Sequence, residues 1–166
     1  LAAPTPDDLN FESLPFGSFS ALRINEWLAN SPSDAGDFVE LYNPSDDPGD
    51  LTGLRLTDDL STSGVGRFTF PALSFIAGGG FAVLTADDSP APGHLPFRLH
   101  ADGEYLRLYR ATGTQIIDEV TWGREEEGVS SGRLPINQHG VPKGQEAITL
   151  GERQIVAVTP AGAYER

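Results

Sequence analysis

The chain has 166 residues, a formal net charge of −13 and no cysteine, so it is long enough to bury one hydrophobic core without disulfides or metal. Only 11 Lys and Arg residues are scattered among 24 Asp and Glu, and this balance argues against binding to nucleic acid or to anionic lipid. No apolar run approaches the roughly 18 residues of a membrane span, so no membrane insertion is expected.

Residues 1–20 read as a linker or N-terminal tail. The segment "LAAPTPDDLNFESLPFGSFS" has three prolines and no sustained periodicity. Its apolar residues Phe11, Leu14, Phe16 and Phe19 are candidates to dock on the domain, which we expect to span 21–166. Because the chain begins at Leu1 and lacks methionine, we expect a processed or excised piece of a longer product.

From residue 22 onward the apolar pattern has the period of two that is typical of strands. Turn clusters rich in Gly, Asp and Pro separate the runs, and the loops at Asp102-Gly103 and Thr112-Gly113 predict two successive hairpins. No helical stripe survives over three turns. The pattern predicts an all-β sandwich or barrel of about seven to ten antiparallel strands with little or no helix. The predicted strands are 22–28, 38–42, 54–56, 67–70, 81–86, 97–101, 104–110, 115–122 and either 147–150 or 155–158.

Glu26 and Glu40 lie on the first two predicted strands. Neighbouring strands are about 4.8 Å apart, which brings two carboxylates within the separation of about 5–10 Å that glycosidases use. In a regular strand, however, Glu26 falls in phase with Ile24 and faces the core, while Trp27 faces outward. A buried carboxylate needs a partner, and Arg133 is the predicted partner of Glu26 or Glu40.

The stretch around "NPSDDPGD" combines turn and metal-binding chemistry. Asn43 precedes a proline, and its side chain is expected to bond the backbone two residues on and close the turn. Asp46, Asp47 and Asp50 are candidate calcium ligands, since loop carboxylates and carbonyls suit that ion. A solvated acidic turn is the alternative.

The order of motifs resembles the lamin tail domain family in its bacterial form, over about residues 22–163. The resemblance rests on the whole series rather than on one motif. The matching stretches are "RINEWLANSPSDAGDFVELYNPSDDPGDLTGLRLTDD", "FTFP" before "IAGGGFAVL", "FRLHADGEYLRLYRATGTQIIDEVTWG", "SSGRLP" and "VTPAGA".

The resemblance implies an immunoglobulin-like β-sandwich without catalytic residues. It also implies an interaction or scaffolding module in a larger exported bacterial protein, placed outside the cell, in the periplasm or on the cell surface. The expected partner is then a protein or a neighbouring domain. A structural signature follows from the same motifs: Asn25, Glu26, Glu40, Asn43, Ser131, Gly132 and Arg133.

Two other functions stay open at this point. The aromatic residues Trp27, Trp122, Tyr42, Tyr105 and Tyr109 are candidates for a sugar-stacking platform. Together with the acidic loops, they favour a carbohydrate-binding or calcium-dependent adhesion module. The third hypothesis is a hydrolase that uses Glu26 and Glu40, and it requires an open cleft that contains both carboxylates.

Overall fold

The computed structural model describes residues 16–17, 19–32, 36–61, 64–133 and 155–158. The predicted all-β class is confirmed, since these residues form strands and two 3-10 turns, η1 (Phe19–Ala21) and η2 (Gly64–Gly66). The strands are β1 (Arg23–Leu28), β2 (Asp37–Tyr42), β3 (Gly49–Asp50), β4 (Arg55–Thr57), β5 (Phe68–Thr69), β6 (Phe75–Ile76), β7 (Phe81–Ala86), β8 (His94–Leu95), β9 (Glu104–Tyr109), β10 (Ile116–Trp122), β11 (Ser130–Arg133) and β12 (Ile155–Val158). Across this described part, no helix has the length and apolarity needed to cross a bilayer.

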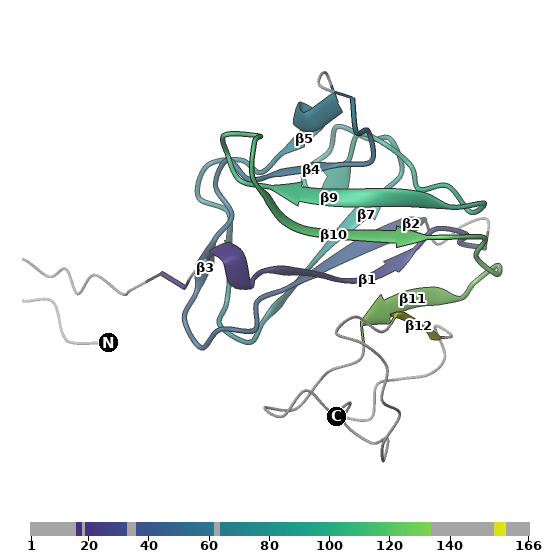
Figure 1. The fold of residues 1–166 in the computed structure, drawn as a ribbon, viewed down its shortest axis with the longest axis horizontal. Coiled ribbons are helices and arrows are strands. Elements are labelled where there is room, and N and C mark those ends of the chain that lie inside the picture. The colour runs from purple at the N-terminus through teal and green to yellow at the C-terminus, as the bar shows by residue number, and fades with distance from the viewer. Residues whose placement is uncertain (1–15, 18, 33–35, 62–63, 134–154, 159–166) are drawn as a thin grey trace, which may run out of the picture.

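Two main sheets form the body of the protein. One has six strands in the order β12-β11-β1-β2-β7-β8, and the other has four in the order β10-β9-β4-β5. Strands β3 and β6 pair separately as a small third sheet. Figure 1 shows β9 and β10 of the four-stranded sheet lying over β1 and β2 of the six-stranded sheet. This arrangement is consistent with a β-sandwich.

The core lies between the two sheets. Inward side chains of both sheets form one cluster, and the largest of them, Trp27, has no exposed surface. Its ring centroid lies 5.5 Å from that of Trp122 on β10. Burying an aliphatic or aromatic side chain of this kind stabilises the fold by about 1.5–3 kcal/mol, so the apolar alternation of the strands drives the stacking of the sheets.

The N-terminal segment reaches the folded body at two phenylalanines. Phe16 stacks on Phe75, with ring centroids 5.6 Å apart, and Phe19 packs against the core. The other two apolar residues of the predicted tail, Phe11 and Leu14, lie outside the described residues.

The structure differs from the predicted strands at 97–101. Phe97 and Leu99 are buried, but the segment makes only an isolated bridge between Arg98 and Asp87. The first of the two predicted hairpins is therefore absent. An extended segment that packs on the core shows the same alternation of apolar residues as a strand, although it pairs with no neighbouring strand. The second hairpin, β9 with β10, is present. The described residues form more strands than the seven to ten expected, because the pattern missed the two-residue strands β3, β6 and β8, which leave no periodic signal, and also missed β11.

A β-bulge in β1 decides which side chains face the core. The register with β2 passes from Ile24 opposite Leu41 to Glu26 opposite Glu40, so Asn25 is an extra residue. An extra residue reverses the phase of everything that follows it. The prediction that Glu26 faces the core and Trp27 faces outward was therefore wrong, since Trp27 is fully buried and Glu26 is only half-buried.

Candidate functional site

The solvent-facing side of the six-stranded sheet carries both predicted acids. Along β2 and β7 the register sets Phe38 opposite Thr85, Glu40 opposite Val83 and Tyr42 opposite Phe81. The residues between them are the inward set: Val39 and Leu41 are fully buried and Leu84 is 7% exposed. We call the outward set the outer face; it comprises Glu26, Phe38, Glu40, Tyr42, Phe81, Val83 and Thr85.

Glu26 and Glu40 form a like-charged pair at the centre of this face. Each carboxylate accepts a bond from a neutral donor: Ser130 Oγ lies 2.6 Å from Glu26 Oε1, and Asn25 Nδ2 lies 2.7 Å from Glu40 Oε1. Neither makes an ion pair with a described Lys or Arg. Burial raises the pKa of Glu40, the bond from Asn25 opposes that rise, and the charge of Glu26 adds to it.

The predicted signature at 131–132 has a steric explanation. Gly132 lies opposite Glu26, and a Cβ placed there would sit 3.1 Å from Asn25 O and 3.4 Å from Glu26 Cβ. Ser131 turns inward, where its Oγ donates to the buried Glu125 carboxylate at 2.8 Å. Gly132 thus leaves room for the Glu26 side chain, while Ser131 satisfies a carboxylate beneath the sheet.

Arg133 joins the two sheets through Asp118, which is 5% exposed. The guanidinium pairs with both carboxylate oxygens of Asp118, and its Nη2 also donates to Glu119 O at 3.1 Å. Asp118 Oδ2 accepts the backbone N–H of Ile24 at 2.8 Å, directly before the bulge.

The prediction that Arg133 neutralises Glu26 or Glu40 was therefore wrong. Side chains alternate along β11, so Arg133 lies on the opposite side of the strand from Gly132 and points between the sheets. A signal for its true partner existed in the sequence: Asp118 falls in phase with Val120 and Trp122, both of which are buried. A carboxylate at a core position needs an ionic or hydrogen-bonding partner, and a nearby arginine supplies both.

Asn43 organises the turn that follows β2. It is 1% exposed, and its Oδ1 accepts Ser45 N at 3.1 Å, which is the bond that the turn sequence predicts. The Nδ2 group donates to Asp47 O at 2.8 Å and to Ala77 O at 3.1 Å. One amide therefore links the β2–β3 turn to the loop before β7.

The three calcium candidates do not converge. Asp46 and Asp47 are exposed, and Asp50 Oδ1 accepts the backbone N–H of Thr52 at 2.8 Å. Within the described ranges, no group of three or more His, Cys, Asp or Glu side chains is arranged to hold a metal ion. The geometry gives the calcium hypothesis no support.

Neither of two surface clefts of the described part contains the acid pair. A polar cleft of about 270 Å³ is lined by Asn30, Asp37, Asp87 and Arg98, among others. A second cleft of about 350 Å³ is lined by Leu60, Tyr105, Arg107, Glu119 and Arg133, among others. Glu26 and Glu40 line neither cleft, whereas a glycosidase mechanism needs both carboxylates to flank the bound sugar.

The proposed sugar platform is also dispersed. Trp27, Trp122 and Tyr109 are buried, at 0%, 9% and 7% exposure. Tyr42 stacks on Phe81, with ring centroids 4.6 Å apart. Tyr105 belongs to the opposite sheet.

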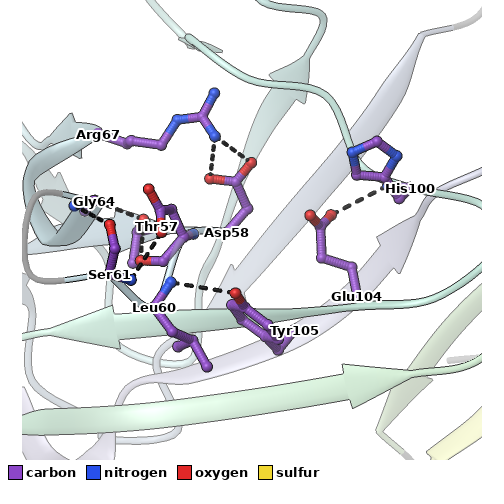
Figure 2. Close-up of polar contacts among 10 residues, drawn as sticks. Thr57, Asp58, Leu60, Ser61, Gly64, Arg67, His100, Glu104 and Tyr105 are labelled. Atoms are coloured by element: carbon purple, nitrogen blue, oxygen red, sulfur yellow. Dashed lines mark hydrogen bonds and ion pairs between the residues drawn. The ribbon is translucent and has the colours of Figure 1, made fainter.

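A second polar network closes the loop after β4 (Figure 2). Arg67 Nη1 bonds both oxygens of Asp58 at 2.8 Å, and its guanidinium lies over the Phe97 ring, 5.2 Å from the centroid. Nearby, Glu104 Oε2 accepts His100 N at 3.1 Å. Burial raises the pKa of both Asp58 and Glu104, and the charge of Asp58 adds to the rise at Glu104. Leu60 N donates to Tyr105 Oη on β9 at 3.3 Å, so the described residues of this loop are tied both to β9 and to the segment before it, which is a structural task.

Replacing Glu40 by glutamine is expected to stabilise the protein at neutral pH by about 0.2–1 kcal/mol, the usual cost of like charges directly opposite on neighbouring strands. Glutamine keeps an acceptor for Asn25. Because the folded-state pKa of Glu40 is raised, the folded protein binds this proton more tightly than the unfolded chain. The contribution of Glu40 to the stability of the wild-type protein therefore falls as pH rises from the unfolded pKa of Glu40, near 4.5, through its folded pKa.

Urea unfolding between about pH 4 and 8 measures this effect. Glu40→Gln should make the free energy of unfolding depend less on pH at the acid end of this range. An unchanged pH dependence would show that neither burial nor the charge of Glu26 raises the pKa of Glu40 in the folded protein.

Comparison with known families returned one finding. The family described as Lamin Tail Domain matches residues 17–124, well over half of the chain. The match begins before β1 and ends two residues after β10, so it includes the acid pair and Asn43 but not 131–133. No curated protein and no solved structure matches the chain.

Proposed function

This chain belongs to the lamin tail domain family, whose members are generally non-catalytic immunoglobulin-like modules, and we propose that it acts as an interaction or scaffolding module of a larger exported bacterial protein. Its partner would be another protein or a neighbouring domain. The proposed place outside the cytoplasm is supported by the resemblance to bacterial members, which usually sit in secreted or surface proteins. Fold alone does not fix a function, so the proposal depends on the outer face.

The observation that carries the proposal is the apolar exposure of that face. Phe81 and Val83 are 57% and 58% exposed, next to one another along β7 on the outward side. Single exposed apolar residues are ordinary, but adjacent ones on a regular sheet surface are typical of contact sites. Strand β2 is paired on both sides, with β1 and β7, and β7 is paired with β2 along its whole length, so the two strands present a regular surface.

The two other hypotheses receive less support from the same surface. A hydrolase needs the acid pair in a cleft, and the pair lies on the outer face instead. A sugar platform needs accessible, coplanar rings, whereas the tryptophans are buried and Tyr42 covers part of Phe81. We therefore propose protein contact, with neither catalysis nor glycan binding at these residues.

Site-directed photocrosslinking tests the proposal. A photoreactive phenylalanine analogue is placed at Val83 and, in a second variant, at Leu73, which is 82% exposed and lies outside the outer face. The variants are produced within the parent protein in its native cells. A discrete crosslinked product from Val83 and none from Leu73 is the expected result. Equal or absent crosslinking at the two positions would contradict a contact role for the outer face.

A further inference from the structure

We propose that the partner segment of the outer face is a polypeptide that presents arginine or lysine beside aliphatic or aromatic side chains. This inference rests on the proposed contact function and adds the chemistry of the partner. It starts from two features that lie side by side: a carboxylate pair that has no cationic partner among the described residues, and exposed apolar side chains in register with it. The register places Glu26, Glu40 and Val83 in one row across β1, β2 and β7.

The charge requirement follows from how the pair is bonded. Ser130 and Asn25 each satisfy one carboxylate oxygen with a neutral donor, while the second oxygen of each has no hydrogen-bond partner among the described residues. The nearest cation on the strand, Arg23, donates Nη1 to the carbonyls of Ser20 and Leu22 instead. A guanidinium placed between the two free oxygens would relieve the repulsion and form charge-assisted bonds to both.

The apolar requirement follows from the row next to the pair. Phe81 and Val83 expose more than half of their surface, and Phe38 and Tyr42 are partly exposed beside them. A charged ligand alone would leave this surface in water, whereas apolar side chains flanking the cation would cover it.

The charge of the whole chain favours the same partner. With a net charge of −13 the protein repels anionic surfaces at long range and attracts cationic ones. The backbone of these strands is fixed by the sheet ladder, so the ordering cost on binding is confined to the side chains of the outer face.

Titration calorimetry with three synthetic peptides tests the inference. The first peptide alternates arginine and valine with blocked ends, the second replaces arginine by glutamate, and the third replaces valine by glycine. We expect heat from the first, none from the second, and at least about tenfold weaker binding by the third, because the third keeps the charge without the apolar contact. Affinity for the first should fall as salt rises.

Charge-matched variants locate the site. Glu26→Gln with Glu40→Gln should weaken the arginine–valine peptide at least about tenfold, since both carboxylates contribute. The control is Glu126→Gln with Glu127→Gln, which removes the same charge from an exposed loop and should change affinity by less than about twofold. Circular dichroism and thermal unfolding verify that both variants are folded.

Each of these measurements either supports or overturns the inference. Equal weakening by the two double variants means that the peptide responds to net charge, and the inference is overturned. No heat from the arginine–valine peptide overturns it as well. If crosslinking from Val83 nevertheless occurs, the contact function stands and only the cationic chemistry of the partner is wrong.

Discussion

Asp118→Ala is expected to lower the free energy of unfolding by about 3–5 kcal/mol, the usual cost of breaking a buried ion pair. The substitution leaves the Arg133 guanidinium, only 16% exposed, without its carboxylate. It also removes the acceptor of Ile24 N, a buried backbone donor. Chemical denaturation at neutral pH measures the loss. Asp118→Asn should lose less, because the amide oxygen can still accept from Ile24.

The adjacent residue supplies the control for this prediction. Glu119 is also on β10 and also pairs with an arginine, Arg107, at 2.7 Å, but its side chain is 44% exposed. Glu119→Ala should therefore cost less than about 1 kcal/mol, as exposed ion pairs usually do. Losses of similar size at the two positions would show that Asp118 and Arg133 do not act as a buried pair.

The Asp118–Arg133 pair also explains why the outer face has its present composition. Asp118 holds the backbone of Ile24 at the position where the extra residue Asn25 enters β1. The bulge then turns Trp27 into the core and Glu26 outward to meet Glu40. A contact between the sheets thus anchors the backbone beside the bulge that directs Glu26 outward, and weakening it should disturb residues of the outer face that it never touches.

Period-two patterning predicted the fold class because most strands keep one apolar face. It failed at β1 because one inserted residue changes which side chains are inward, and the insertion leaves no mark in composition: "RINEWL" reads as a regular strand. Pairing is likewise invisible from alternation, since Phe97 and Leu99 alternate like a strand and pack without joining a ladder.

The candidate site was predictable in its residues more than in its contacts. Asn25, Glu26 and Glu40 do meet, because neighbouring strands bring them together. The phase of Asp118 with buried Val120 and Trp122 indicates a core carboxylate, but its pairing with Arg133 also depends on which side of β11 faces the opposite sheet, and alternation alone does not give that. Asn43 required only local chemistry: an Asx residue before proline, whose side-chain oxygen accepts the backbone N–H two residues on.

Asn43→Asp is expected to destabilise the protein by about 3 kcal/mol or more at neutral pH, although the two side chains have the same shape. The wild-type amide donates to Asp47 O and Ala77 O, and a carboxylate would direct negative charge at both carbonyls. At a site that is 1% exposed, such an uncompensated charge is costly. The pKa of the introduced carboxyl should therefore rise, and the loss should grow as pH increases above its unfolded value of about 3.9.

Asn43→Ala separates the charge effect from the loss of the hydrogen bonds. It leaves the same two carbonyls and Ser45 N without the side chain, but introduces no titrating group. Its destabilisation should be about 1–3 kcal/mol and nearly independent of pH. Urea midpoints at about pH 4 and pH 7.5 for both variants give the comparison. Parallel pH profiles of the two variants would show that the carbonyls do not sense the carboxylate and that the amide acts only by filling space. Profiles that diverge as pH rises would show that the donors of Asn43 hold the β2–β3 turn against the loop before β7.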